Sequence, residues 1–475
     1  MRKAHILSAR IATKEKMPHI VDELDALFSP RQLKRDADSL AEWGRDATRD
    51  HTAAPSAVVF PESTDDVLAL VELANARGLE LVPSGGRTGL SGGAVASNHE
   101  IVVSFDRMNQ ILDFNAADRL LTCQAGVITQ AIQEFAIERG LFYPVDFASS
   151  GSSQIGGNIA TNAGGTKVIR YGLTRDWIAG LRVVSGSGKV IDCNHGLVKN
   201  ATGYDLRHLF IGSEGTLGFV VEAQVRLAPA PAPQLVMVLG VGEFRDILDV
   251  LAQFQSTLTL SAFEFFSELA LQKVIAHRNL QRPLENAAPF YALLEFDAAE
   301  VDAATSAFEH AVAAGWVSDG VLSQSKAQAS MLWQLREGIS ESLSAYAPYK
   351  NDLSVRVSAM PDFLDEVDAL VQASYPDFEV CWYGHIGDGN LHLNILKPEY
   401  LSMAAFHERC HAISPRIFEL IAARDGSISA EHGVGLLKRD FLRYSRSADE
   451  LEIMRALKTV LDPNQIMNPG KLLPP

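Results

Sequence analysis

The fold is decided by the stretch Ser84-Gly85-Gly86-Arg87-Thr88-Gly89-Leu90-Ser91-Gly92-Gly93. It follows the apolar run 79–83, whose composition predicts a strand. Small residues leave the backbone N–H groups open, so the main chain can approach a pyrophosphate closely. One such loop is a weak signal, because glycine also makes plain turns.

Two further glycine-rich clusters occupy 146–165 and 204–218, within the same run of expected strands. Three such loops are hard to explain as turns, and together they predict an extended groove for a large dinucleotide. None has the strand, G-x-G-x-x-G and helix context of the Rossmann fold. The nearest match, Gly240-Val241-Gly242, lacks the third glycine, and we interpret it as a strand-to-helix turn that opens a new domain.

The combined loops resemble the FAD-binding domain of the vanillyl-alcohol oxidase and p-cresol methylhydroxylase flavoproteins. The resemblance extends over most of the chain and implies FAD as the cofactor. Members that attach flavin covalently often use a histidine in the first loop, where this sequence has Arg87, so we expect non-covalent FAD. The matched motifs and the C-terminal tail place these residues at the cofactor: Pro83, Ser84, Gly85, Gly86, Arg87, Thr88, Gly89, Ser152, Gly156, Gly157, Asn158, Thr161, Asn162, Gly164, Gly165, Gly212, Glu214, Gly215, Thr216, Gly218 and Asn468.

Local patterns predict the elements around these loops. Thr64 is expected to cap a helix that Gly78 ends. Helices are expected over 17–50, 64–77, 244–257, 302–314 and 450–461, and strands over 57–61, 79–83, 234–239, 261–266, 290–296, 378–383 and 391–396.

The predicted fold class is α+β. Pro229-Ala230-Pro231-Ala232-Pro233 is a stiff linker, and the elements beyond it predict an antiparallel sheet with helices on one face, which resembles the family's cap domain. Before the linker we expect a two-subdomain FAD-binding domain of the p-cresol methylhydroxylase type. The expected division is an N-terminal extension and helix (1–53), the FAD-binding domain (54–230), the substrate or cap domain (231–425) and a C-terminal segment that returns to the FAD-binding domain (426–475).

Composition limits the class of protein. A chain of 475 residues is too long for one core, and a net charge of -16 argues against nucleic acid or anionic membrane as the main partner. No run reaches the roughly 18 apolar residues of a membrane helix. The four cysteines are far apart and fit a reducing compartment, so we expect a bacterial cytoplasmic protein, or a mitochondrial matrix protein in a eukaryote. The basic segment Met1–Lys16 loosely resembles a transit peptide, but a disordered start or an upstream start codon is the preferred interpretation.

A predicted hairpin over Trp382–Asn394 holds two histidines. Asp388-Gly389 is a strong two-residue turn, and folding there places His385 directly opposite His392, with Cβ atoms about 5 Å apart. Two imidazoles on one face could share a metal ion. The simpler alternative is an ordinary hairpin with one polar face.

Glu431 is the candidate third ligand. Two histidines and a carboxylate suit Zn²⁺ and leave positions open for substrate, although the ligand types also accept Mn²⁺ or Fe²⁺. His432 is the natural proton acceptor, provided that the chain turns at Gly433 and Gly435. The alternative is that Glu431 caps a helix that starts near Gly435.

The hairpin and the Glu431-His432 pair resemble the D-2-hydroxyacid dehydrogenases of this flavin family. The resemblance implies that His385, His392 and Glu431 are metal ligands, that His432 is the catalytic base and that Asn394 contacts substrate. It also implies that a substrate carboxylate is bound by Arg336, Ser340 and Lys350. Arg336 and Ser340 are expected on one helical face, and the family more often has threonine at the Ser340 position.

The expected function is metal-assisted oxidation of a D-2-hydroxy acid, with 2-hydroxyglutarate ahead of lactate, by hydride transfer to flavin N5. Carbanion formation followed by electron transfer stays open. The family implies a soluble acceptor such as electron-transfer flavoprotein, with O₂ as an alternative, and a homodimer. The competing readings are a D-lactate or glycolate dehydrogenase without metal, and a non-catalytic FAD-binding subunit.

Overall fold

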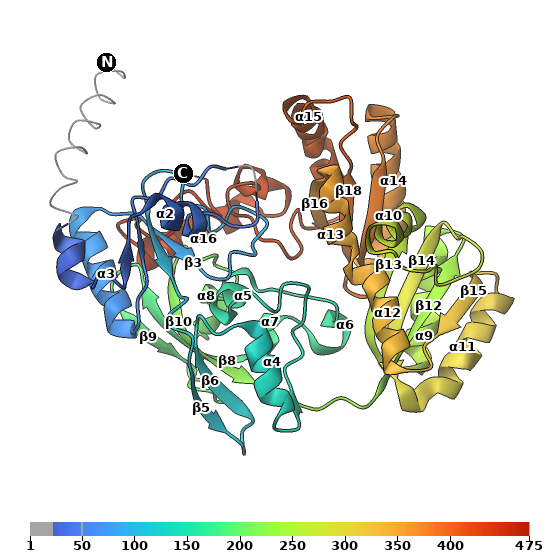
Figure 1. The fold of residues 1–475 in the computed structure, drawn as a ribbon, viewed down its shortest axis with the longest axis horizontal. Coiled ribbons are helices and arrows are strands. Elements are labelled where there is room, and N and C mark those ends of the chain that lie inside the picture. Colours follow the sequence, from blue (N-terminus) through green and yellow to red (C-terminus); the bar gives the residue numbers. More distant parts are fainter. Residues whose placement is uncertain (1–21, 49–50, 475) are drawn as a thin grey trace.

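Residues 22–48 and 51–474 are described by the computed structural model of the protein. The basic segment Met1–Lys16 and the start of the predicted helix 17–50 lie outside these residues. The ribbon forms two lobes, and the chain passes from the first to the second through a light-green connection at the bottom of the view (Figure 1).

The first lobe contains two sheets that share an apolar core. The smaller has the order β1-β2-β4-β3, in which β2, β4 and β3 are parallel, and the larger is antiparallel with the order β5-β6-β10-β8-β9. Their bounds are β1 (Leu33–Lys34), β2 (Ala57–Val59), β3 (Leu81–Ser84), β4 (Ile101–Ser104), β5 (Ile111–Asn115), β6 (Leu120–Gln124), β8 (Ile178–Ser185), β9 (Val190–Cys193) and β10 (Gly218–Arg226).

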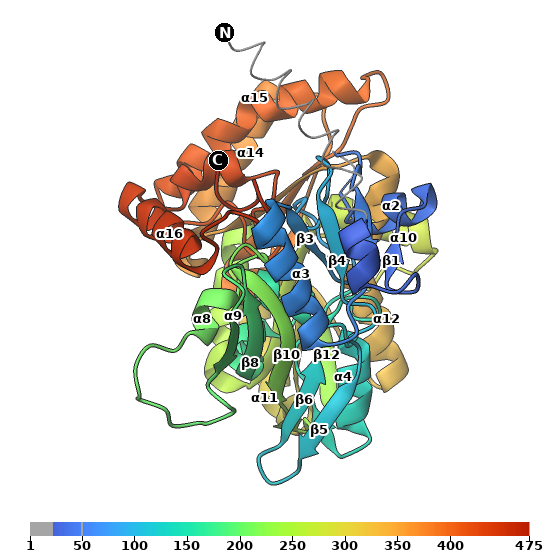
Figure 2. The same ribbon diagram turned by 90° about the vertical axis from the view of Figure 1, so that its left-hand side faces the viewer.

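Helix α3 (Thr64–Arg77) packs against residues of both sheets. It lies in front of the sheets in Figure 2. Its predicted bounds are confirmed, but Ser63 rather than Thr64 is the N-cap, because the extended Ser63 accepts the N–H of Asp66 through its hydroxyl. Gly78 ends the helix in the left-handed region at φ 66°, as predicted.

The single helix predicted over 17–50 is wrong within its described part. Residues 22–27 are helical, the chain then forms β1, and a second helix, α2 (Ala37–Trp43), begins after the N-cap Asp36. Pro30 explains the break, because a proline excludes the helical conformation at the residue before it and lacks the N–H that a helix needs.

The second lobe is built on a seven-stranded antiparallel sheet with the order β15-β12-β14-β13-β17-β18-β16. The strands are β12 (Gln234–Val241), β13 (Leu260–Ser267), β14 (Phe290–Asp297), β15 (Val317–Leu322), β16 (Tyr349–Ser354), β17 (Val380–His385) and β18 (Asn390–Ile395). Strand β12 includes Gly240 and Val241, so the turn after it starts at Gly242.

Four long helices cover one face of this sheet, as predicted: α9 (Phe244–Thr257), α11 (Val301–Ala313), α14 (Met360–Ser374) and α15 (Met403–Ala422). The arrangement differs from the prediction on the other face, where three shorter helices pack: α10 (Glu268–Arg278), α12 (Lys326–Glu337) and α13 (Ile339–Leu343). Of these shorter helices, α12 and α13 contribute residues to the site described below.

The C-terminal segment lies against the first lobe. Helix α16 (Ala448–Leu461) starts with a capping box of Ser447 and Glu450, and Met467 forms a parallel bridge with Leu81. The buried ammonium of Lys458 donates to the carbonyl oxygens of Thr216 and Met467, both at 2.7 Å, and pairs with Asp462. One side chain therefore connects the tail to the third glycine-rich loop.

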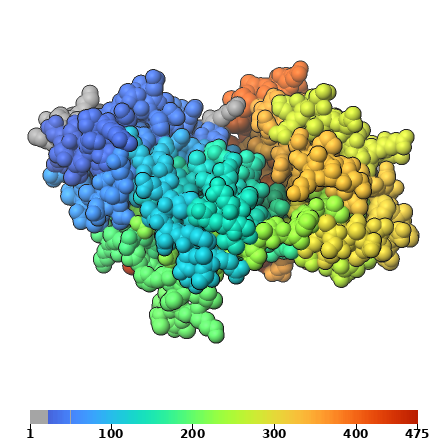
Figure 3. Space-filling view, turned by 60° about the horizontal axis from the view of Figure 1, so that its bottom comes forward, coloured from blue at the N-terminus to red at the C-terminus, as the bar shows by residue number. Residues whose placement is uncertain are grey.

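The four cysteines are buried free thiols, and no helix in the described part of the chain is long and apolar enough to cross a membrane. The loop between β9 and α8 (Arg207–Phe210) protrudes from the surface (Figure 3), where Tyr204 is 98% exposed.

Replacing Lys458 by methionine should destabilise the protein by about 3–5 kcal/mol, because the carboxylate of Asp462 and two carbonyl oxygens lose a buried cation. The measurement is the urea unfolding curve. As the control, Arg455→Met removes a cation from an exposed position of the same helix and should change stability by less than about 0.5 kcal/mol. Equal effects of the two substitutions would contradict this assignment.

Candidate active site

A cavity of about 420 Å³ lies where the two lobes meet. The three glycine-rich loops form its wall on the first lobe, and residues of α12, β17 and β18 form the facing wall. The predicted site residues that line it are Pro83, Gly85, Gly86, Arg87, Thr88, Gly89, Gly156, Gly157, Asn158, Thr161, Gly164, Gly165, Glu214, Gly215, Gly218, Arg336, Ser340, His385, His392, Glu431 and His432.

Other predicted cofactor residues do not line the cavity: Ser84, Ser152, Asn162, Gly212, Thr216 and Asn468. Asn468 shows what such residues do. Its Nδ2 donates to the carbonyl oxygens of Gly93 (2.9 Å) and Glu214 (2.7 Å), so it ties the first glycine-rich loop to the third. Asn468 therefore positions the loops without lining the cavity.

Close backbone packing explains the glycine at position 86. A Cβ there would lie 2.1 Å from the carbonyl oxygen of Ser152, so the first and second loops touch main chain to main chain. At Gly157, by contrast, a Cβ would meet nothing within 4 Å, which leaves open space beside the wall.

Two cavity residues that sequence reasoning missed carry unused acceptors. Gln154 donates through Nε2 to Asp106 Oδ1 (2.7 Å), while its Oε1 and Asp46 Oδ2 are buried without a hydrogen-bond partner among the described residues. Buried acceptors are normally satisfied, so these atoms fit a ligand that offers donors, as FAD does. The sequence offered a signal for Gln154 as a cavity residue, because it is a polar residue just before the helix α5 (Ile155–Thr161) in the second loop.

The histidine hairpin forms, but its predicted register is wrong. His385 pairs with Asn390, and Tyr383 rather than His385 lies opposite His392. The turn uses four residues, because Ile386–Asp388 form a 3-10 turn that Gly389 ends at φ 86°. The shift equals two residues, so each side chain keeps its predicted face. The two imidazoles therefore still meet, with ring centroids 5.4 Å apart.

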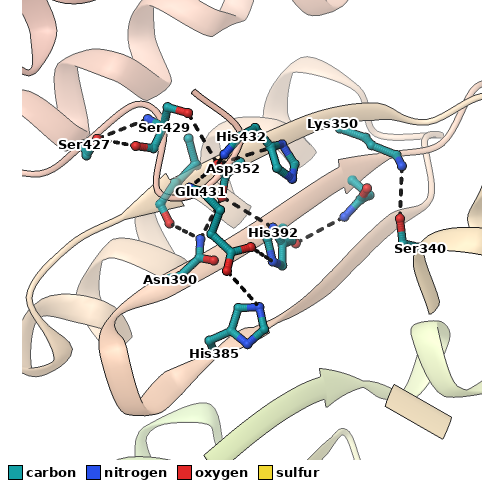
Figure 4. Close-up of polar contacts among 12 residues, drawn as sticks. Ser340, Lys350, Asp352, His385, Asn390, His392, Ser427, Ser429, Glu431 and His432 are labelled. Carbon is teal, nitrogen blue, oxygen red and sulfur yellow. Dashed lines mark hydrogen bonds and ion pairs between the residues drawn. The ribbon is translucent and has the colours of Figure 1, made fainter. Parts of the chain in front are cut away.

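Glu431 lies between the two histidines (Figure 4). Its Oε1 is 3.7 Å from His385 Nε2, and its Oε2 is 3.9 Å from His392 Nε2. The backbone N–H of Gly165, from the second glycine-rich loop, donates to Oε1 at 3.1 Å. The alternative in which Glu431 caps a helix is wrong, because the next helical segment in the described chain is η5 (Arg439–Tyr444).

The turn that brings Glu431 and His432 to one site forms as the glycines predicted. Gly433 and Gly435 have φ values of 79° and 48°, a region that favours glycine. The carboxylate of Glu214, from the third loop, accepts the N–H groups of Val434 and Gly435, both at 2.7 Å. The glycine-rich loops therefore fix the turn as well as the cavity wall.

Asp352 is the buried acceptor at the centre of the site and was missed as a site residue. Its Oδ2 accepts the N–H groups of Glu431 (2.8 Å) and His432 (2.9 Å), and its Oδ1 accepts Nδ2 of Asn390 (2.9 Å). Burial alone would raise the pKa of Asp352, but His432 and Lys438 lower it below its ordinary value. Its position inside strand β16, beside polar neighbours, gave no signal of these long-range partners.

Glu264 is the second carboxylate that sequence reasoning missed. It lies on β13, is 1% exposed, and contacts both His385 and Arg336. The sequence did offer a signal that could have identified Glu264, because it is the single charged residue among the apolar residues of that strand. Burial alone would lower the pKa of His385, but Glu264 and Glu431 raise it to about 9.

The predicted acid-binding residues come together from four elements. Arg336 and Ser340 fall in successive helices, α12 and α13, which meet at Gly338 in the right-handed helical conformation, and both residues line the cavity. Lys350 and Asn394 do not line it, but they are opposite each other on β16 and β18, and Lys350 Nζ donates to Ser340 Oγ at 3.2 Å. Arg336 Nε and Asn394 Oδ1 are buried and lack hydrogen-bond partners among the described residues.

Comparisons with known proteins agree with this arrangement. A family model for the C-terminal domain of FAD linked oxidases matches residues 230–472, and one for an FAD binding domain matches residues 55–194. A D-2-hydroxyglutarate dehydrogenase of Stutzerimonas stutzeri (strain A1501) is 57% identical over 96% of this chain and 99% of that protein. A mitochondrial D-2-hydroxyglutarate dehydrogenase of Bos taurus is 37% identical over 95% of this chain and 84% of that protein. The solved structure of p-cresol methylhydroxylase with substrate bound has the same fold, with a TM-score of 0.74 at 14% identity over 97% of each chain.

Replacing Asp352 by alanine should destabilise the protein by roughly 3–5 kcal/mol, because three buried N–H donors lose their acceptor. Asp352→Asn keeps one side-chain oxygen and should recover part of this loss. Chemical denaturation of the two variants measures the difference. The exposed Asp365 provides the control, since Asp365→Ala should cost under about 1 kcal/mol. An Asp352→Ala protein as stable as that control would show that the three donors do not depend on Asp352.

Proposed function

Because the chain belongs to the FAD-linked oxidases and, among them, to the family of the D-2-hydroxyglutarate dehydrogenases, we propose that it oxidises D-2-hydroxyglutarate, in preference to other D-2-hydroxy acids, to the 2-oxo acid. The observation that carries this proposal is the meeting of two groups of residues at one cavity. The glycine-rich loops form one wall, and His385, His392, Glu431 and His432 face it.

When bound, FAD supplies the hydride acceptor, and a divalent metal ion, Zn²⁺ for preference, supplies a Lewis acid. Residues His385, His392 and Glu431 would hold the metal, because their ligand atoms lie within 4.8 Å of one another. A second group of this size, Asp352, His392 and His432, fits less well. The oxygens of Asp352 already accept four hydrogen bonds, and Oδ1 of Asp352 faces Nδ1 of His392 rather than Nε2.

His432 is the proposed base. Burial lowers its pKa, so the imidazole is neutral near pH 7 and able to accept a proton. Its Nδ1 faces Asp352 Oδ2 at 3.8 Å, which leaves Nε2 to take the proton of the substrate hydroxyl as the C2 hydride leaves. Its ring stacks on His392, with centroids 5.8 Å apart and planes at 16°, so the base is next to a proposed metal ligand.

The substrate acid is proposed to bind at Arg336, Ser340, Lys350 and Asn394. Arg336 lines the cavity with an unused Nε–H donor, and a planar guanidinium suits a carboxylate. Lys350 adds a second positive charge behind Ser340. A substrate with two carboxylates uses both the metal-binding set and this basic group, which is why 2-hydroxyglutarate is preferred over lactate.

The remaining assignments are proposals from the family. Electrons are proposed to leave the reduced flavin for a soluble carrier such as electron-transfer flavoprotein, and the protein is proposed to act as a homodimer. A cytoplasmic location fits the bacterial source of the 57% identical relative, and the mitochondrial matrix would be the eukaryotic counterpart.

An anaerobic flavin-reduction screen tests the proposed function. D-2-hydroxyglutarate should bleach the flavin faster than D-lactate, glycolate or the L-enantiomers. Exhaustive chelation should slow this reaction and added Zn²⁺ should restore it, because a metal held by His385, His392 and Glu431 would polarise the substrate hydroxyl. Full activity in chelated, metal-free protein would instead support a lactate or glycolate dehydrogenase that works without metal. Absence of bleaching by every acid would support a non-catalytic subunit.

Replacing His432 by alanine should leave flavin bound and slow its anaerobic reduction by roughly 10²–10⁴-fold, the usual contribution of a general base. Stopped-flow absorbance of the flavin measures this rate. His277→Ala, at an exposed position of α10, is the matched control and should reduce at the wild-type rate. An unchanged rate in the His432 variant would remove this residue from the mechanism.

A further inference from the structure

Glu264 is a buried carboxylate to which the proposed function gives no role. It lies on β13 between phenylalanines 263 and 265, both in the apolar core, and is 1% exposed. Burying a charge in such surroundings is costly unless the charge is paired and hydrogen-bonded. The partners of Glu264 should therefore show what this residue does.

Both oxygens of Glu264 face residues of the proposed chemistry. Strand pairing sets Glu264 directly opposite His385, and His385 Nδ1 lies 2.8 Å from Oε1. A carboxylate can only accept, so Nδ1 carries a proton, and Nε2 is the ring nitrogen that a metal ion could take. Arg336 Nη2 lies 2.7 Å from Oε2 and forms an ion pair with it, although the approach lacks good hydrogen-bond geometry.

Nε2 of His385 faces the metal-binding set. Its Nε2 is 3.7 Å from Glu431 Oε1, and Arg336 Nη2 is also close to it, at 3.5 Å. The other proposed histidine ligand repeats the arrangement, because His392 turns Nδ1 towards Asp352 (3.6 Å) and Nε2 towards Glu431. A carboxylate behind the imidazole is the usual way in which a protein fixes the tautomer of a metal ligand.

We propose that Glu264 is a positioning residue that fixes His385 as a metal ligand and aims Arg336 at the substrate acid. This inference rests on the proposed function and extends it. One side chain thereby links the metal-binding residues to the acid-binding residues, and it does so by offering an acceptor to each.

The amide in Glu264→Gln cannot serve both partners, since it has one acceptor and one donor group where two acceptors are needed. Arg336 only donates, whereas a neutral imidazole can change tautomer. The amide oxygen should therefore turn to Arg336 and the amide nitrogen to His385 Nδ1. That places a proton on His385 Nε2 and blocks the ligand atom.

The test is equilibrium dialysis of the flavoprotein against buffered Zn²⁺. Glu264→Gln should lower zinc affinity by about 10–100-fold while the flavin spectrum stays unchanged. Arg336→Met, which leaves Glu264 ionised, should keep zinc affinity but raise the apparent Kd for D-2-hydroxyglutarate in anaerobic flavin reduction. The double substitution Glu264→Gln with Arg336→Met frees the amide oxygen for His385, so it should regain zinc affinity.

The rescue by the double substitution is the outcome that a merely structural role would not produce. Wild-type zinc affinity in Glu264→Gln would overturn the inference. If Glu264→Gln does not fold, the double substitution provides the test. A double variant that folds but binds zinc weakly would also overturn the inference. Failure of the proposed function itself shows in a different comparison, between the wild type and His385→Ala. If His385→Ala bound zinc as tightly as the wild type, both the proposed metal site and this inference would be overturned.

Discussion

The site depends on the buried carboxylate of Asp352, which is 0% exposed. A strand in the middle of the chain supplies this acceptor, and the N–H groups that it binds belong to a turn about 80 residues later. Without it the turn at Glu431 and His432 would carry two unsatisfied buried donors. Hydrogen bonds from backbone N–H groups to a charged acceptor are among the strongest available, so this contact can hold a segment that lacks regular structure.

The same turn is held from the other lobe. Glu214 of the third glycine-rich loop accepts two further N–H groups of the turn, and Gly165 of the second loop donates to Glu431. The loops that form the proposed cofactor wall are therefore hydrogen-bonded to the segment that carries the proposed metal ligand and base. Two lobes with separate cores can share one rigid site because the connecting bonds are made by backbone groups, which move little, and by buried carboxylates.

The sequence was sufficient for the cavity wall and for the identity of the ligand candidates, because these follow from local patterns. The local sequence of a glycine-rich loop indicates its conformation. The two-residue period of a strand keeps His385 and His392 on one face, even though the predicted register was shifted by two residues. Asp352 and Glu264 could not be found in this way. Their partners are fixed by which strands become neighbours in the seven-stranded sheet, and sequence periodicity says nothing about that order.

Charge balance gives a physical reason for a dication at this position. Among the buried or half-buried carboxylates around the histidines, Glu264 faces Arg336, and Asp352 has Lys438 nearby. Glu431 contacts the imidazoles of His385 and His392 and the N–H of Gly165. Since burial lowers the pKa of His392, that imidazole supplies no charge, and the excess negative potential raises the pKa of His385 to about 9. A divalent cation among the three ligands would satisfy this potential better than one proton on Nε2, because it carries twice the charge and is shared by all three.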